Sequence, residues 1–472
     1  MIPIYTRYLT PGDYGLLELL DLTLNVMAMF VGLNMGSAVL RYYLYFDDPK
    51  EKLEVFTTSL IFTFILSILA LGVLESLSIP ISKLVSGDSE YSRYFQITFL
   101  CLAIQTIYLI PETYLLACKK SLIYSSLSIG AFVSGLGLNI LFLVFMKMGV
   151  LGILLSMLIT KALNGLVVSA ITLRSVRFSF SWGKLRKIIS FSLPLVPAAF
   201  SMFIIHFSDR FFIQKFCNLN DLGLYSLGYK FGMILSIIVS VPIFRIWDTQ
   251  RFEAAKSENG NKMISRIFTY FTAVIIFAGL GICMFVDEII HIMAASEYQG
   301  ASKVVPLIVL SYVLYGIANF FTLGIMISNK TKYIAYIQLP VAGANILFNI
   351  LFISHYGVIG AAISTVLSFL LLATFNFIIS QKLYEVPIEY RRVPFLFGLA
   401  ISIFGVSRLI EMPLLISLGI KSLMMVGFPL LLLAGSFFYE EEITKGKDQL
   451  RGIASYFRLR KGLAKMGGPT KE

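Results

Sequence analysis

Apolar residues run along this chain in long stretches separated by short polar loops. Each stretch is close to the roughly 20 residues that a helix needs to cross a hydrocarbon core about 30 Å thick. The stretches are continuous rather than alternating, which favours helices over the strands of a membrane barrel. The predicted spans are 14–40, 56–78, 94–117, 121–146, 150–173, 188–215, 222–246, 264–286, 304–327, 333–353, 357–379, 394–412 and 415–438.

Composition supports a membrane protein. The chain has 472 residues, of which 57% are hydrophobic and 14% are charged. Its mean hydropathy is +0.82, whereas a soluble domain carries roughly 25% charged residues. The net charge of +12 does not indicate nucleic acid as a partner, because basic residues in a membrane protein first report its topology. We therefore predict an all-α, polytopic membrane protein.

The sequence repeats at a fixed offset. The segment GVLGILLS at 149–156 returns as GVIGAAIS at 357–364, and DYGL at 13–16 returns as DLGL at 221–224. Both pairs share an offset of 208 residues. Two motifs that share one offset indicate a duplicated unit, which in an apolar chain is typical of a transporter built from two like lobes around a central site.

The repeat predicts the domain organisation. We expect a first lobe at 1–180 and a second lobe at 181–383, each built from six helices and related by a parallel repeat around a central cavity. Two additional membrane helices at 384–440 and a cytoplasmic tail at 441–472 complete the prediction.

The first span of the second lobe, 188–215, has its counterpart at about −20 to 7 when the offset is subtracted. The start of the first helix is therefore expected to be largely missing from this sequence, through a late start codon or a truncation. A full chain is expected to carry roughly 20 more residues before Met1.

Loop charge predicts the orientation. Most of the 39 Lys and Arg residues fall in alternate loops and in the tail, which places those loops and the C-terminus in the cytoplasm. The most basic internal loop, 174–187, joins the two predicted lobes.

Catalytic and metal-binding patterns are weak in this sequence. The three histidines lie far apart, and the four cysteines lie in or beside apolar runs without metal-ligand spacing. We find no nucleophile elbow, phosphate loop or zinc-protease motif, and no outer loop is long enough for a catalytic domain. The sequence therefore predicts no enzyme, no cofactor and no metal site.

Charged residues inside the spans are the informative ones, because each costs about 2.5–3.5 kcal/mol at mid-bilayer and needs a partner or a wet cavity. Lys161 lies at the middle of the span 150–173 with no acid nearby in its helix. We interpret it as a cavity-facing cation or, alternatively, as the partner of a buried acid. Lys230, a third of the way along 222–246, has the same two interpretations.

Two further sets of residues are candidates. Arg41 and Arg245 occupy corresponding cytoplasmic ends of the second helix of each lobe; they either snorkel to the lipid surface or form a matched cationic pair. His206, Asp209 and Arg210 share one helix face. They form either an internal Asp–Arg pair or a substrate or proton site.

Glu18 and Asp21 share a face of the span 14–40. They could pair with basic residues across the lobe interface, and we also include them as candidates for ion coupling.

Several motifs together resemble a known family. They are Pro3-Ile4-Tyr5-Thr6-Arg7-Tyr8-Leu9-Thr10-Pro11-Gly12-Asp13-Tyr14-Gly15, Asp209-Arg210-Phe211-Phe212-Ile213, Asp221-Leu222-Gly223-Leu224-Tyr225-Ser226 with Tyr229-Lys230, and the pair Asn139-Ile140-Leu141-Phe142 and Asn349-Ile350-Leu351-Phe352. The chain resembles the polysaccharide-transport family, the O-antigen (Wzx-type) flippases of the multidrug/oligosaccharidyl-lipid/polysaccharide exporter superfamily.

The resemblance implies two six-helix lobes with a V-shaped central cavity. It implies a bacterial inner-membrane flippase that moves a polyprenyl-pyrophosphate-linked oligosaccharide from the cytoplasmic to the periplasmic leaflet. Membrane lipids, a polysaccharide polymerase and glycosyltransferases are the implied partners. Coupling to a proton or cation gradient is common in the superfamily, with His206 and Asp209 as our first candidates.

Three alternatives stay open. A peptidoglycan lipid-precursor flippase shares the fold and a cationic cavity. A drug/cation antiporter should favour acids in its cavity, whereas the deepest lone charges here are lysines. A membrane enzyme of glycan assembly would need a catalytic cluster.

Overall fold

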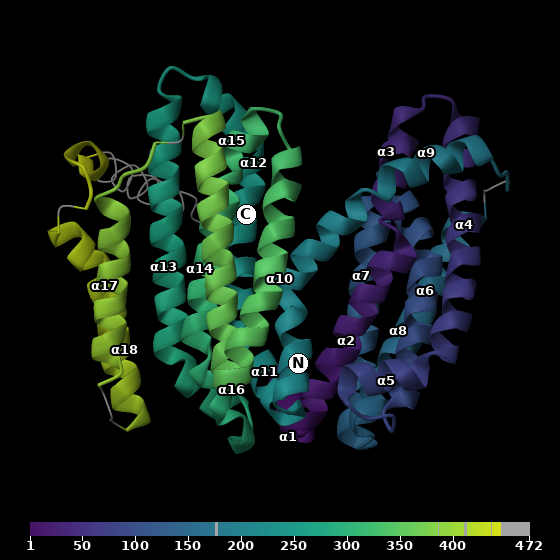
Figure 1. The fold of residues 1–472 in the computed structure, drawn as a ribbon, viewed down its shortest axis with the longest axis horizontal. Coiled ribbons are helices and arrows are strands. Elements are labelled where there is room, and N and C mark those ends of the chain that lie inside the picture. Colours follow the sequence, from purple (N-terminus) through teal and green to yellow (C-terminus); the bar gives the residue numbers. More distant parts are fainter. Residues whose placement is uncertain (175–177, 386, 410–412, 436, 445–472) are drawn as a thin grey trace, which may run out of the picture. The chain divides into compact units, whose positions relative to one another are not determined.

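The computed structural model describes residues 1–174, 178–385, 387–409, 413–435 and 437–444. Residues 1–388 form one compact unit and residues 389–472 a second. Within the described ranges every regular element is a helix (Figure 1), as predicted. The expectation for the tail beyond 444 lies outside these ranges.

The helices follow the predicted spans closely. The first lobe contains α1 (Ile2–Tyr8), α2 (Pro11–Gly32), α3 (Met35–Tyr45), α4 (Pro49–Ser76), α5 (Ser78–Ser86), α6 (Ser92–Ala117), α7 (Ser121–Asn139), the π-helix η1 (Ile140–Phe145) and α8 (Gly149–Leu173). The second lobe contains α9 (Trp182–Ser192), α10 (Leu195–Phe216), α11 (Leu219–Leu235), η2 (Ser236–Ser240), α12 (Val241–Lys256), α13 (Gly260–Met293), η3 (Ser296–Lys303), α14 (Val305–Phe320), α15 (Thr322–Ile327) and α16 (Lys332–Leu383). The second unit contains α17 (Arg392–Ser407) and α18 (Leu414–Ala434).

In the described part of the chain, 11 helical stretches are long and apolar enough to cross a membrane. The 52-residue α16 counts once, although Gly357 interrupts it with φ 56° and ψ −133°, and α17 is shorter. Each predicted span therefore overlaps a helix. The division into two lobes stays a prediction, and we keep both names for 1–180 and 181–383.

Helices α2 and α11 begin with matching caps. The Thr10 side chain accepts a hydrogen bond from the Asp13 backbone N–H, and Asp13 in turn accepts from the Thr10 backbone. At the offset of 208, the Asn218 side chain accepts from the Asp221 N–H and donates to the Asp221 carboxylate. In each lobe the repeated Asp therefore pairs with the residue that caps its helix.

The repeated glycine brings these two helices into backbone contact. A Cβ atom on Gly15 would collide with the carbonyl oxygen of Leu219, and one on Gly223 would collide with that of Pro11. The offset of 208 relates Gly15 to Gly223 and Pro11 to Leu219, so the repeat maps each of these two contacts onto the other. Only glycine permits this approach. Hereafter "the crossing" means this contact between α2 and α11.

A second repeated motif has a glycine with a closely similar positive φ in both lobes. Gly149 has φ 58° and Gly357 has φ 56°. Positive φ is the region in which glycine is favoured. Each of these glycines begins a helical segment that carries one copy of the GVxG motif. The sequence repeat thus corresponds to matched turns.

Buried amides and hydroxyls join the helices of the second lobe. The Ser208 hydroxyl donates to Asn345, whose amide donates to Ser368, and the Asn349 amide donates to both Ser208 and Asn345. All four side chains are buried. Hydrogen bonds of this kind hold membrane helices together where the surrounding lipid supplies no hydrophobic drive. They fix α10 against both parts of α16.

Arg392 organises the second unit. Its guanidinium lies 3.1 Å from the Glu389 carboxylate and 2.8 Å from that of Glu442, and it stacks on the Tyr439 ring at 3.7 Å. The start of α17 is thereby tied to the segment that follows α18.

Gly15→Ala and Gly223→Ala should each force the crossing apart, because the added Cβ meets backbone rather than a flexible side chain. Cysteines at positions 12 and 220, where Gly12 faces the Asn220 side chain, would report this as a lower yield of disulfide cross-link in membranes. Gly72→Ala is the matched control, since its Cβ would meet open space. An unchanged yield in both crossing variants would contradict the contact.

Candidate functional site

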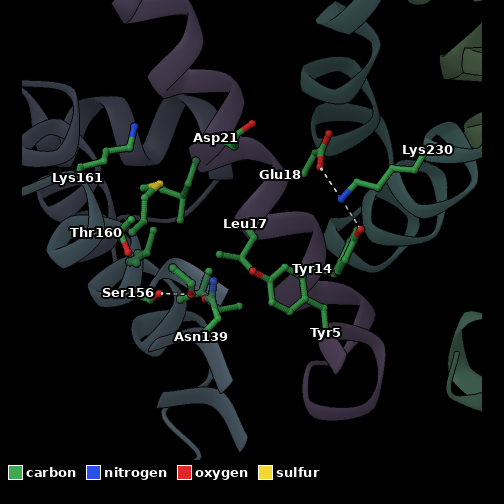
Figure 2. Close-up of a pocket in the computed structure, with 15 residues that line it drawn as sticks. Tyr5, Tyr14, Leu17, Glu18, Asp21, Asn139, Ser156, Thr160, Lys161 and Lys230 are labelled. Atoms are coloured by element: carbon green, nitrogen blue, oxygen red, sulfur yellow. Dashed lines mark hydrogen bonds and ion pairs between the residues drawn. The ribbon is translucent and has the colours of Figure 1, made fainter. Parts of the chain in front are cut away.

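A cavity of about 380 Å³ lies inside the first unit, between α2, α7, α8 and α11 (Figure 2). It is lined by charged, aromatic, amide and hydroxyl side chains together with apolar ones. The lining residues are Tyr5, Tyr14, Leu17, Glu18, Leu20, Asp21, Gly135, Asn139, Ile153, Leu154, Ser156, Met157, Thr160, Lys161 and Lys230.

Four predicted residues meet in this cavity. Lys161 on α8 lies on one side and Lys230 on α11 on the other, with Glu18 and Asp21 of α2 between them. Three helices far apart in sequence thus bring two cations and two carboxylates into one space. At neutral pH these four groups are formally balanced in charge.

Lys161 is held by a neutral partner. Its ammonium donates a hydrogen bond to the side-chain oxygen of Gln105 on α6. Because an amide carries no charge, the hydrogen bond orients the ammonium without neutralising it. Lys161 therefore presents a positive charge to the cavity from the middle of a membrane span.

Lys230 links the lobes. Its ammonium donates to the Tyr14 hydroxyl and lies 4.5 Å from the centre of the Tyr14 ring. It also lies 3.9 Å from the Glu18 carboxylate. Both partners belong to α2, so this single side chain of the second lobe binds the first lobe just beside the crossing.

Arg210 and Asp209 form a buried ion pair. One Asp209 oxygen lies 2.7 Å from the Arg210 guanidinium, and the other accepts hydrogen bonds from Tyr225 and Thr365. The two side chains are 1% and 2% exposed, so the pair is desolvated and its members depend on each other. It joins α10 to α11 and α16. The internal Asp–Arg interpretation describes this geometry.

Part of the Arg210 guanidinium stays without a hydrogen bond. Its Nη1 donates to the His206 carbonyl at 2.6 Å, and its plane stacks on the Tyr229 ring at 3.7 Å. The Nε atom is buried and has no hydrogen-bond acceptor. The Glu18 carboxylate lies 3.9 Å from Nε, which is too long for a hydrogen bond.

Two polar atoms of the cavity wall are also unsatisfied. The Asn139 side-chain oxygen and the Thr160 hydroxyl are buried and have no hydrogen-bond partner among the described residues. Both residues line the cavity. Buried polar groups are normally satisfied, so groups of this kind are suited to contact with a bound molecule.

Tyrosines surround the crossing. The Tyr298 hydroxyl of η3 donates to the Leu9 carbonyl at 3.0 Å, and its ring meets Tyr14 edge-on at 6.0 Å. Burial raises the pKa of Tyr298 and that of Tyr5. Both phenols therefore stay protonated at neutral pH and act as neutral hydrogen-bonding groups.

The other predicted residues lie outside the cavity wall. Arg41 and Arg245 are exposed, and Arg41 stacks on the Phe191 ring at 4.3 Å. The His206 ring packs between Tyr315 and Phe369, with centroids at 4.7 and 4.9 Å. The structure does not bring these three side chains together with the lysines, and the roles predicted for them stay predictions.

Sequence reasoning missed several cavity residues. Tyr14 lies inside the repeated DYGL motif, which was noticed for its offset and not for its phenol. Gln105 is an amide within the apolar span 94–117, a signal that could have identified it as the partner of Lys161. Asn139 belongs to a repeated motif that does not by itself indicate a cavity position, and Thr160 gives no signal beyond its place next to Lys161.

A family model described as "Polysaccharide biosynthesis protein" matches residues 4–303. The chain is similar to an uncharacterized membrane protein of Haemophilus influenzae, at 26% identity over 247 residues, which is 51% of this chain and 57% of that protein. It is also similar to the "Probable low-salt glycan biosynthesis flippase Agl15" of Haloferax volcanii, at 23% identity over 191 residues, or 40% of each. The matches thus span about half the length of these curated relatives.

Three solved structures share the fold. The lipid II flippase MurJ in an inward closed conformation gives a TM-score of 0.75 at 13% identity, covering 92% of this chain and 95% of that one. An inward-facing multidrug resistance MATE family transporter of the MOP superfamily gives 0.66 at 16% identity, covering 84% and 94%. A multidrug resistance MATE family transporter of the MOP superfamily in an outward-facing conformation gives a TM-score of 0.54 at 16% identity, covering 84% of this chain and 91% of that one.

Asp209→Asn should lower the free energy of unfolding by about 3–5 kcal/mol, because it leaves the buried Arg210 without its counter-charge. The measurement is thermal or denaturant unfolding of the purified protein in detergent. Asp21→Asn makes the same chemical change at a carboxylate exposed to the cavity and should cost little. Equal losses in both variants would rule out a special role for the buried pair.

Proposed function

The chain belongs to the polysaccharide biosynthesis protein family, and from that premise we propose that it is a flippase for a lipid-linked oligosaccharide. The proposed substrate is a polyprenyl-pyrophosphate-linked repeat unit for surface polysaccharide such as O-antigen, capsule or exopolysaccharide. The proposed location is the bacterial inner membrane, with the C-terminus in the cytoplasm. Proposed partners are membrane lipids and the glycosyltransferases and polymerase that make and use the repeat unit.

The observation that carries this proposal is the cavity wall. It combines the cations Lys161 and Lys230 with the unsatisfied Asn139 oxygen and Thr160 hydroxyl. Ammonium groups inside a membrane attract a pyrophosphate, and amides and hydroxyls hydrogen-bond sugars. A substrate with an anionic head and a polar glycan needs both kinds of group in one water-accessible space.

The crossing supports transport by alternating access. The loop charges place the N-terminal ends of α2 and α11 on the outer side, and there the two backbones touch. Relative rocking of the two lobes would then carry the cavity from one side of the membrane to the other.

A second candidate is a cation/drug antiporter of the same fold, and one observation favours it. Glu18 and Asp21 bring two carboxylates into the cavity beside the lysines, and carboxylates attract cationic drugs or a coupled cation. A peptidoglycan lipid-precursor flippase would use the same cationic groups as our first candidate.

The deciding experiment is gene deletion. Loss of surface glycan with accumulation of unpolymerised lipid-linked repeat units, both restored by the gene, would establish the first candidate. Unchanged surface glycan with higher sensitivity to cationic dyes would replace it with the antiporter. Arrested cell-wall synthesis with normal surface glycan would favour the peptidoglycan precursor.

Lys161→Ala and Lys230→Ala should each abolish transport while leaving membrane insertion intact, because each removes a cation that meets the substrate's pyrophosphate. The measurement is recovery of surface glycan in the deletion strain, with immunoblotting for protein level. Lys215→Ala, which removes an exposed cation at the end of α10, is the control and should restore glycan fully. Normal glycan with both cavity variants would overturn the cationic-cavity assignment.

A further inference from the structure

We propose that, in the empty cavity, the Glu18 carboxylate occupies the place of the substrate phosphate beside Lys230 and Arg210. When a phosphate binds these two cations in its stead, the contact between α2 and α11 at the crossing is released. The inference rests on the proposed function for the identity of the anion. It assigns Glu18 a role distinct from ion coupling, as the side chain that links occupation of the cavity to separation of the lobes.

Glu18 lies between two cations of the opposite lobe. One carboxylate oxygen is 3.9 Å from the Arg210 Nε, and the other is 3.9 Å from the Lys230 ammonium. The Glu18 side chain is 17% exposed, so these charges interact through a medium of lower dielectric than water. The carboxylate therefore attracts α10 and α11 toward α2.

The attraction leaves hydrogen-bonding capacity unused. At 3.9 Å neither cation makes a hydrogen bond to Glu18. The Arg210 Nε is buried without an acceptor, and the Lys230 ammonium has three donors, of which Tyr14 takes one. A phosphate carries more acceptor oxygens than a carboxylate and can meet both donors with short, charge-assisted bonds. A substrate phosphate can therefore displace Glu18 from both cations.

The position of Glu18 connects this exchange to the crossing. It lies one helical turn beyond Gly15 and four residues after Tyr14, on the helix whose backbone touches α11. Once Lys230 and Arg210 bind a phosphate instead of Glu18, the charge attraction between the lobes that lies nearest the crossing is lost. The close backbone contact and the Tyr298 hydrogen bond to Leu9 then remain, so the outer ends need less free energy to separate.

Asp21 provides an internal comparison. It lies one turn further along α2 and lines the same cavity. Its carboxylate accepts a hydrogen bond from Asn25 on its own helix at 3.2 Å. Removing the charge of Asp21 also makes the cavity more positive, but it removes no ion pair that bridges the lobes.

The test measures the outer ends of the lobes directly. Spin labels at Glu90 and Glu297, both exposed beyond the spans, are introduced after the four native cysteines are replaced by alanine. Distance distributions are recorded in lipid nanodiscs for wild type, Glu18→Gln and Asp21→Asn, with and without inorganic pyrophosphate. Binding of inorganic pyrophosphate is measured on the same samples by calorimetry.

We expect Glu18→Gln to shift the ligand-free distances to longer values and to bind pyrophosphate about tenfold more tightly, since the competing charge is gone. Asp21→Asn should tighten binding less and leave the ligand-free distances unchanged. In wild type, pyrophosphate should shift the distances in the direction of Glu18→Gln. Unchanged ligand-free distances in Glu18→Gln would overturn the proposal, whatever the binding results.

Failure of the proposed function has a different signature. If no variant binds pyrophosphate while Glu18→Gln still lengthens the ligand-free distances, the phosphate is wrong as the occupant and the flippase proposal falls with it. Tyr14→Phe guards against misfolding of Glu18→Gln: it removes the hydrogen bond from Lys230 without changing charge, and it should give a smaller shift in the same direction. Wild-type distances in a folded Tyr14→Phe would count against the link between Lys230 and the crossing.

Discussion

The backbone contact between α2 and α11 is the constraint on which the first unit depends. Because Gly15 and Gly223 carry no side chain, the two helices approach so closely that a Cβ atom at either position would collide with a backbone carbonyl. That approach brings Lys230 within reach of Tyr14 and Glu18, and it brings Glu18 within 3.9 Å of Arg210. Lys230 and Arg210 can therefore lie this close to Glu18 only while the crossing is closed.

The polar groups divide into those that hold the fold and those that face the cavity. Asp209 is saturated by Arg210, Tyr225 and Thr365, and the buried amides of Asn345 and Asn349 hydrogen-bond to each other and to Ser208. These groups stiffen the second lobe, so that it can move as a rigid body. Lys161, Asn139 and Thr160 instead keep charge or hydrogen-bonding capacity toward the cavity, which is the condition for binding a ligand.

Sequence reasoning gave the helices and several of the charged residues, for different physical reasons. Span length and apolar runs follow from bilayer thickness, so the helices were predictable one by one. Lys161 and Lys230 were found because a charge within a span is costly. Their meeting with Glu18 and Asp21 was not predictable in detail, because it depends on the crossing, and the offset of 208 did not reveal that Gly15 touches α11. His206 shares a helix face with Arg210, yet its ring packs among Tyr315 and Phe369.

The balance of charge in the cavity bears on which substrate the proposed flippase would accept. With both carboxylates beside both lysines, the empty cavity is close to neutral, and a net cationic site arises only if a carboxylate moves away. Exchange of Glu18 for phosphate would free this carboxylate from Lys230 and Arg210 while an entering anion takes its place, so neither cation is left unpaired inside the membrane. A cationic substrate that approached Glu18 would meet Lys230 and Arg210 at the same carboxylate and would be repelled by both. The geometry at Glu18 therefore favours an anionic head group over a cationic drug, even though two acids line the wall.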